Sequence, residues 1–339
     1  MRATIVGPTR GAASPSPGKQ LPVRRHAWTI VGALVIVAVT AALTQLPQTQ
    51  LNSYTISVAY SLAFFVAVAQ SWNLISGFTG YISFAHGALV GIGSYTGILV
   101  ANRGWDLPAT IAAGALVAAI ASFLIGVPSL RLRGLAFAFA TIFFQAIVLV
   151  VVEKAVSLTG GSQGLAMRDL VPVDELLVVM ALIAGAATML VHLLRRSRLG
   201  LRLLAVREDE DAAQAIGIRT TRLKLGAFAV SSAFAGAAGA VHAYFLATVF
   251  PLSVFDIQTS VEPLVIALLG GSGSAFGPAL VGGVYALSQE ALQQLGSELQ
   301  LSLFGALLLL VVLFARDGVA GVASRLVDAL RRRRDGGHR

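Results

Sequence analysis

Apolar segments close to the length of a membrane span limit this chain's fold more than any other feature. A hydrocarbon core of about 30 Å requires about 20 helical residues, and segments of roughly this length recur along most of the 339 residues. We predict ten spans, at 28–46, 54–75, 81–101, 107–128, 135–155, 176–194, 225–248, 258–271, 276–294 and 299–315. The sequence therefore predicts an all-α, polytopic membrane protein with about ten transmembrane helices.

The composition agrees with a membrane protein. Only 12% of the residues are charged and 56% are hydrophobic, whereas a soluble domain carries about 25% charged residues. The net charge is +9, but the basic residues lie between the apolar segments, where they meet lipid headgroups. We therefore expect membrane lipid as a partner and no nucleic acid. The absence of cysteine excludes disulfides, thiolate metal ligands and a cysteine nucleophile.

The distribution of Lys and Arg predicts the orientation. With the N-terminus in the cytoplasm, 22 of the 25 basic residues fall on the cytoplasmic side, as basic residues usually do, so both termini are predicted to be cytoplasmic. The chain then divides into a disordered basic tail at 1–26, a transmembrane domain at 27–316 and a basic amphipathic tail at 317–339. Trp28–Leu46 is long enough to span, and no clear small-residue cleavage site follows it, so we expect no cleaved signal peptide.

The longest charged interlude is 195–224, which we predict to be a cytoplasmic loop containing a short helix. Asp209 is a suitable N-cap, acidic residues follow in the first turn, and Gly217 can end the helix in a left-handed conformation. The adjacent Ala212 and Ala213 would let the backbone or an aromatic side chain of a partner approach closely. The alternative is that any cytoplasmic loop is basic and partly helical.

Motifs for chemistry are largely missing. No G-x-x-x-x-G-K-[ST] sequence is present, so the chain has no recognisable means of binding ATP by itself. No H-E-x-x-H motif occurs. The segment Gly160–Gly164 matches G-x-S-x-G only formally, because no strand–turn–helix context surrounds it. We predict no catalytic residue, no metal site and no cofactor.

Polar residues lie within or near the predicted spans at His86, Gln145, His242 and Glu262. Such groups are costly in lipid, so they should face the bundle interior or a cavity, although each could simply form an interhelical hydrogen bond. The eighth span is short and ends in a glycine-rich run from Gly270, which indicates a broken or re-entrant helix.

Small residues spaced four apart predict close helix packing, and the segment before the third span is expected to be a flexible elbow. The small-residue groups are Gly87/Gly91, Gly93/Gly97, Ser232/Gly236/Ala240 and Ala279/Gly283, and the elbow is Ser76–Gly80.

Five blocks of sequence follow one another in a distinctive order. They are Gly77-x-x-Gly80-x-x-Ser83-x-x-His86-Gly87-Ala88, Arg131-Leu132-Arg133-Gly134, Leu158-Thr159-Gly160-Gly161-x-x-Gly164, Arg207-Glu208-Asp209-Glu210-x-Ala212-Ala213-x-Ala215-x-Gly217-Ile218 and Leu269-Gly270-Gly271-x-Gly273-Ser274-x-x-Gly277-Pro278. Together they resemble LivM-type permeases, the membrane subunits of branched-chain amino acid ABC importers. The resemblance covers roughly residues 55–316.

This resemblance implies that 195–224 is the loop that couples the permease domain to partner ATPases. The implied coupling residues are Arg207, Glu208, Glu210, Asp211, Ala212, Ala213 and Gly217, and the candidates for the translocation pathway are His86, Gly87, Gln145, Glu262, Gly270 and Gly271. It also implies two cytoplasmic ATP-binding subunits, a second permease subunit of the LivH type, an extracytoplasmic solute-binding protein and a place in the bacterial cytoplasmic (inner) membrane.

Three positions depart from the family pattern, and alternatives to amino acid import stay open. Asp211 replaces a glutamate, Ala85 a glycine and Gln145 a glutamate of many relatives. Related permeases serve urea, short amides and aromatic acids. A self-sufficient secondary transporter should show paired intramembrane acids and inverted repeats, and an intramembrane enzyme should show clustered catalytic residues.

Overall fold

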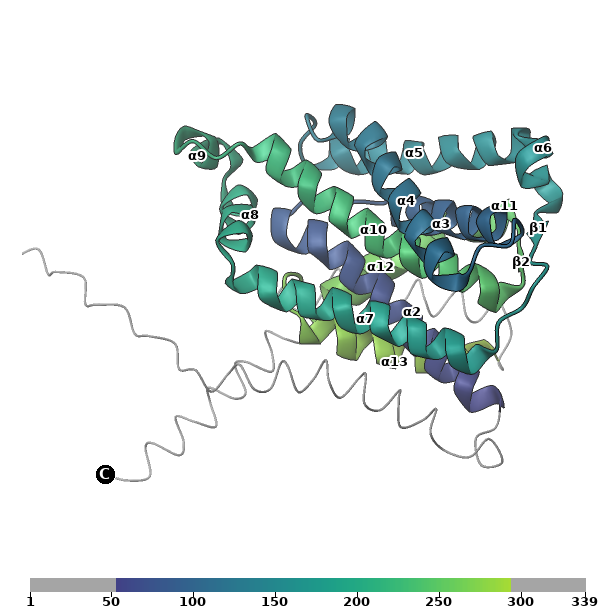
Figure 1. Ribbon diagram of the computed structural model, residues 1–339. Helices are drawn as coiled ribbons and strands as arrows, with labels where there is room; N and C mark the ends of the chain where they lie inside the picture. Colours follow the sequence, from purple (N-terminus) through teal and green to yellow (C-terminus); the bar gives the residue numbers. More distant parts are fainter. Residues whose placement is uncertain (1–52, 294–339) are drawn as a thin grey trace, which may run out of the picture.

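The computed structural model describes residues 53–293, which form a bundle of long helices (Figure 1). Both predicted tails and the predicted spans at 28–46 and 299–315 lie outside the described residues. The count of ten spans, the division of the chain and the side on which the termini lie therefore stay predictions.

Helices make up nearly all of the described secondary structure. The long helices are α2 (Ser53–Trp72), α3 (His86–Ala101), α4 (Leu107–Ser129), α5 (Leu135–Lys154), α7 (Val173–Arg196), α10 (Thr220–Leu246), α12 (Ile257–Gly270) and α13 (Phe276–Gln293). The short ones are η1 (Asn73–Gly77), α6 (Val156–Thr159), η2 (Gly161–Gln163), α8 (Arg198–Glu208), α9 (Glu210–Ala215) and α11 (Pro251–Val254). Strands β1 (Leu165–Ala166) and β2 (Thr248–Val249) form a small antiparallel ladder.

The predicted helical, multi-pass architecture is confirmed for the described part of the chain. Six helical segments between residues 54 and 270 are long and apolar enough to cross a membrane, and α3 is a shorter apolar helix. The eighth span also ends at the glycine-rich run, as the sequence predicts. There α12 ends at Gly270, Gly271 has a φ of +94°, and α13 begins at Phe276.

Two expectations for the segment before α3 are wrong. The span predicted at 81–101 becomes helical only at His86, and residues 80–85 have no helical structure. The Trp72 indole N–H holds that stretch by donating to the Ser83 carbonyl oxygen at 2.8 Å. The segment Ser76–Gly80 was expected to be a flexible elbow. Its first two residues instead belong to η1, a π-helical turn whose five residues are all buried.

Small residues set the closest helix contacts, as the sequence predicts. Helix α10 packs against α3 and α4, and a Cβ on Gly93 would lie only 2.2 Å from the Gly236 carbonyl oxygen. A Cβ on Gly114 would lie 3.0 Å from that same oxygen. Glycine is therefore required where these backbones meet. The surrounding core includes Tyr60, Val66, Leu89, Ile98, Leu176 and Phe228.

The bundle has polar ends and apolar flanks. In Figure 1 the α8–α9 segment lies at the left end, whereas α6, β1 and β2 lie at the right end. Helices α4 and α5 expose large apolar side chains along their length, including Leu124 (76% exposed) and Phe143 (64% exposed). Such a flank suits hydrocarbon rather than water, so the two polar ends correspond to the two membrane surfaces.

Candidate functional site

The segment predicted to be a charged loop folds as α8 and α9 at one end of the bundle (Figure 1). The Asp209 carboxylate caps α9 by accepting from the backbone N–H groups of Asp211 at 2.9 Å and Ala212 at 3.0 Å. Gly217 follows the helix with a φ of +86°. The predicted short helix, its N-cap and its left-handed closing glycine are therefore confirmed.

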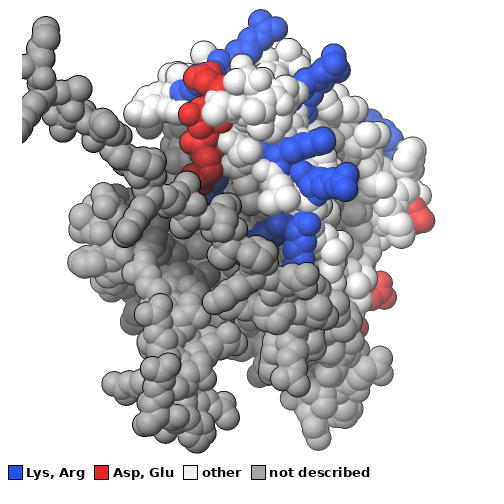
Figure 2. All heavy atoms as spheres, turned by 90° about the vertical axis from the view of Figure 1, so that its left-hand side faces the viewer, with Lys and Arg blue, Asp and Glu red and all other residues white. Residues whose placement is uncertain are grey.

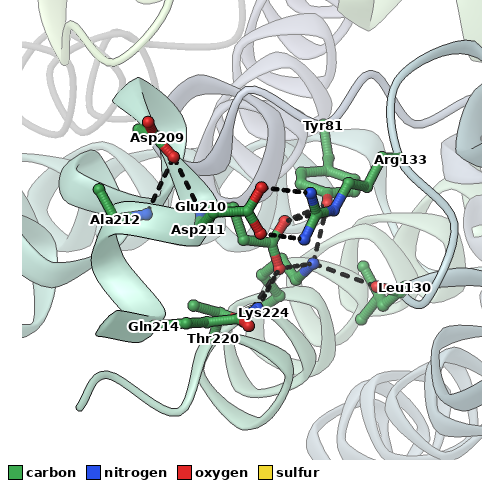
Figure 3. Close-up of polar contacts among 10 residues, drawn as sticks. All are labelled: Tyr81, Leu130, Arg133, Asp209, Glu210, Asp211, Ala212, Gln214, Thr220 and Lys224. Atoms are coloured by element: carbon green, nitrogen blue, oxygen red, sulfur yellow. Dashed lines mark hydrogen bonds and ion pairs between the residues drawn. The ribbon is translucent and has the colours of Figure 1, made fainter. Parts of the chain in front are cut away.

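A buried ion pair holds α9 against the bundle (Figure 3). Lys224 of α10 is 1% exposed and donates from Nζ to Glu210 Oε1 at 2.7 Å. Its other two protons reach the Tyr81 hydroxyl at 2.9 Å and the Leu130 carbonyl oxygen at 3.1 Å. The Tyr81 and Thr220 hydroxyls in turn donate to Glu210. Every proton of the ammonium group thus has an acceptor, which is the condition for burying it.

A second, solvent-exposed pair joins α9 to the turn between α4 and α5. Arg133 donates two parallel hydrogen bonds to the Asp211 carboxylate, at 2.6 and 2.8 Å. These bonds hold the pKa of Asp211 below its ordinary value. Burial alone would raise the pKa of Glu210, but the hydrogen bonds from Lys224 and its neighbours outweigh burial and lower it. Both carboxylates are therefore charged at neutral pH.

The outward side of α9 is small and apolar. Ala212 and Ala215 are exposed, and Ile216 directly after the helix is 76% exposed. Ala213 is only 2% exposed, because it lies on the side of α9 that is turned towards the bundle. The expectation that both adjacent alanines face a partner is thus wrong for Ala213.

Charged side chains surround this small apolar area. Figure 2 shows the same end of the molecule, where basic side chains gather beside a run of acidic ones. A surface of mixed sign around an apolar centre is typical of a protein–protein contact. The exposed charged residues of the α4–α5 turn and of the chain from the last turn of α7 to the first turn of α10 are Arg131, Arg133, Arg195, Arg196, Arg198, Arg202, Arg207, Glu208, Asp209, Asp211, Arg219 and Arg222.

Arg207 connects the α8–α9 segment to two interruptions in the long helices. Its Nη1 donates to the Gly77 carbonyl oxygen at 2.6 Å, and its Nη2 donates to the Ser272 hydroxyl at 3.3 Å. Gly77 ends η1, and Ser272 lies in the link between α12 and α13. The Arg207 side chain passes Gly80, where a Cβ would lie 3.1 Å from Arg207 Cγ.

The two interruptions are also bonded to each other. The Asn73 side chain accepts from the Gly273 N–H at 2.7 Å and donates to the Ser274 carbonyl oxygen at 2.7 Å. A Cβ on Gly77 would lie 2.7 Å from the Gly273 nitrogen, and one on Gly270 would lie 2.2 Å from a backbone nitrogen of α13. The turn η1, which continues α2, and the α12–α13 link therefore form one compact joint, which we call the Arg207 joint (Arg207, Asn73, Gly77 and 271–275).

The predicted pathway residues do not gather in one place. Gln145 of α5 donates from its amide to the carbonyl oxygens of Phe255 at 2.9 Å and Asp256 at 2.7 Å, and it accepts from the Ser260 hydroxyl. A glutamate carboxylate has no proton to donate to those two carbonyls, which accounts for an amide at this position. Gln145 thus fixes the start of α12.

His86 and Gly87 lie at the start of α3, near the same helix. The Gly87 N–H donates to the Ser260 hydroxyl at 2.8 Å, and a Cβ on Gly87 would clash with that hydroxyl at 2.6 Å. His86 is fully buried, and its Nε2 lies 2.9 Å from the Ser231 hydroxyl of α10. These contacts join three helices, α3, α10 and α12.

Glu262 stands apart from both groups. It lines a pocket of about 420 Å³ between α2, α10, α12 and α13. Its carboxylate accepts from the Tyr285 hydroxyl at 3.1 Å and the Gln258 amide at 3.2 Å. Gly270 and Gly271 lie at the far end of α12, about 12 Å along the helix. The roles of all six pathway candidates in solute passage stay predictions.

Several residues of the site escaped sequence reasoning, chiefly Tyr81, Thr220, Asn73 and the buried role of Lys224. Of these residues, Lys224 is the one whose role the sequence indicates best, because a lysine in the first turns of an apolar helix requires a buried acceptor. Among residues 53–293, no group of three or more His, Asp and Glu lies close enough together to hold a metal ion.

The comparisons with known proteins agree with the five blocks of sequence. A family model described as branched-chain amino acid transport system / permease component matches residues 54–312. The chain is 28% identical to the high-affinity branched-chain amino acid transport system permease protein LivM of Salmonella typhimurium and to LivM of Escherichia coli K12, over 78% of this chain and 69% of each relative. It is also 28% identical to LivH of E. coli K12, over 81% of this chain and 95% of that relative. No solved structure matches the chain. The chain therefore belongs to the family of branched-chain amino acid transport system permease components.

Proposed function

We propose that the chain is a membrane-spanning subunit of an ABC importer that moves branched-chain or related amino acids across the bacterial cytoplasmic membrane. Its likeness to both LivM and LivH supports pairing with a second, LivH-type permease. Two partner subunits bind and hydrolyse ATP, and an extracytoplasmic binding protein delivers the solute. The chain itself contributes neither a catalytic residue nor a cofactor. Urea, short amides or aromatic acids are the alternative solutes for the same architecture.

The coupling role is supported chiefly by the ion pairs that hold α9 against the bundle. The helix is anchored from inside by the Lys224–Glu210 pair and from outside by Arg133–Asp211. The same helix presents Ala212 outward, and the exposed Ile216 follows the helix directly. Because α9 is held rigidly, a force that a partner applies to it would move the bundle, whereas a flexible loop would only bend.

Movement of α9 can reach the long helices through the Arg207 joint. Arg207 directly precedes the acidic run that opens α9, and its guanidinium bonds both η1, which continues α2, and the α12–α13 link. A shift of the α8–α9 segment therefore displaces α2 and α12 together. ATP binding by the partner subunits would then favour one arrangement of the helices over another, and solute would pass because its affinity differs between the two.

The substitution Ile216→Glu tests the coupling surface. A charge in the centre of the apolar area should lower the affinity for the ATPase subunits by at least about tenfold. The centre of a protein–protein contact rarely accommodates a charged side chain. The measurement is the amount of ATPase that co-purifies with the tagged permease from detergent. Thr221→Glu is the matched control, because it places the same charge on an exposed position of the same end. Equal ATPase recovery from both variants would refute the assignment of α9 as the coupling helix.

A further inference from the structure

The 420 Å³ pocket lies near the end of the bundle opposite α9. It is lined by the last turns of α10, including His242 and Phe245, and by Thr259 and Glu262 in the first turns of α12. Ser61 and Phe64 of α2 form another wall. A volume of this size is typical of small-molecule sites, which are mostly apolar and carry a few polar groups.

The charged side chains that line the pocket are acidic. Two carboxylates, Glu262 and Glu290, line the pocket, and no Lys or Arg is among the lining residues between 53 and 293. The imidazole of His242 is stacked on Phe64 at a ring-centroid distance of 4.0 Å, and its Nδ1 lies 3.5 Å from the Tyr60 hydroxyl. The pocket therefore offers a negative group and aromatic faces, which together favour a cation with an apolar body.

Helices α2 and α12 connect this pocket to the other end of the molecule. Both contribute lining residues to the pocket, and both end at the Arg207 joint. A displacement transmitted through that joint would change the distance between the walls that carry Ser61 and Glu262. The pocket is thus placed where motion of the coupling segment changes its affinity for a solute.

We propose that this pocket is a solute site for small molecules that combine a protonated amine with an apolar side chain, with the Glu262 carboxylate accepting the ammonium group. This proposal rests on the proposed function and narrows its solute class. A free acid that lacks an amine would bring an uncompensated negative charge to two carboxylates, whereas an amino acid is neutral overall and offers its ammonium group to Glu262. Urea would leave the aromatic walls uncovered. Amino acids with apolar side chains therefore fit the site better than aromatic acids or urea do.

A single cysteine in this cysteine-free chain tests the charge of the pocket. In the assembled complex carrying Ser61→Cys, we expect 2-aminoethyl methanethiosulfonate, a cation, to react about tenfold faster than the anionic 2-sulfonatoethyl reagent, each relative to a free thiol in solution. Adding Glu262→Gln should remove most of this preference. Adding Asp174→Asn, at the start of α7 and outside the pocket lining, should leave it intact. An unchanged preference after Glu262→Gln, or a cysteine that neither reagent reaches, would overturn the proposal.

Protection by ligands tests the solute class in the same complex. L-leucine and leucinamide should slow labelling of the cysteine, whereas 4-methylpentanoate, which has the same apolar skeleton without the amine, should not. Equal protection by all three compounds, or none by any, contradicts an amine site. ATPase recovery is measured on the same preparations. Its loss would count against the importer assignment, whereas the labelling results bear on the pocket alone.

Discussion

At the scale of single residues, Lys224 shows how one buried charge fixes a neighbouring helix. Its ammonium group loses the solvation of water, and three protein acceptors replace that solvation. Glu210 is the only charged acceptor of the three, and its side chain is 11% exposed. Removing one member of such a pair leaves the other charge buried without a counter-ion, which usually costs about 3–5 kcal/mol.

The first prediction follows from this pair. Glu210→Gln should free α9 from the bundle locally, because opening the segment to water costs less than burying an unpaired Lys224. Hydrogen exchange of the backbone amides in 209–217 should rise by at least about tenfold. The long helices should keep their protection, since the break is confined to one end.

The double substitution Glu210→Leu with Lys224→Met separates loss of charge from loss of packing. It replaces the buried pair with apolar groups, which is often close to neutral in free energy. We expect exchange in 209–217 to be closer to the unmodified protein than in Glu210→Gln. If the single variant showed unchanged exchange, the ion pair would have no role in mounting α9.

At the scale of elements, sequence reasoning succeeded where the signal is local. The N-cap at Asp209, the closing glycine at 217 and the break after Gly270 each depend on one residue and its immediate neighbours. The π-helical turn at 73–77 was missed, because its geometry depends on the partner segment 271–275 that lies some 200 residues later. The late start of α3 has the same origin, since a tertiary bond from Trp72 holds the preceding residues.

The second prediction concerns the Arg207 joint. Arg207→Ala and Arg207→Lys should both lower solute uptake, by about tenfold, since hydrogen bonds from a charged group contribute roughly 1.5–3 kcal/mol and an ammonium cannot reproduce the fork of a guanidinium. The ATPase subunits should still assemble, because the exposed side of α9 is unchanged. Stimulation of ATP hydrolysis by the loaded binding protein should fall in parallel with uptake.

Arg202→Ala is the matched control, since Arg202 is an exposed arginine of the same helix, α8. Uptake and stimulated hydrolysis should fall far less in this variant, since Arg202 is not part of the Arg207 joint and a single exposed charge contributes little to a contact. Normal stimulation in Arg207→Ala would show that the joint does not carry the coupling signal, even if α9 binds the ATPase.

At the scale of the whole molecule, the polar groups that the sequence placed within spans serve different purposes. His86 and Gln145 join helices inside the bundle, whereas Glu262 lines a pocket. The sequence could identify each as costly in lipid but could not decide between these uses, because the distinction depends on which helix faces it. The close contact of Gly93 and Gly97 with Gly236 and Ala240 of α10 was predicted correctly, since close packing needs only small residues at the right spacing.

The last prediction concerns orientation, which follows from charge. The described residues show α8 and α9 at one end of the bundle, with α6, β1 and β2 at the other, and the Lys and Arg residues gather at the α8–α9 end (Figure 2). Because basic residues stay on the cytoplasmic side, a single cysteine at Ser162 should react with a membrane-impermeant maleimide in intact cells. A cysteine at Arg202 should react only after the membrane is opened.

Cysteines at Ser14, Ser297 and Gly336 extend the same test to the predicted first and tenth spans. With ten spans and both termini inside, position 297 should be labelled from outside, whereas positions 14 and 336 should require permeabilisation. Labelling of position 14 in intact cells would mean that residues 28–46 do not cross the membrane. Labelling of position 336 would mean that the number of spans after α13 differs from the one predicted. Reactivity of position 202 from outside would invert the whole arrangement, and α9 would then face away from any cytoplasmic ATPase.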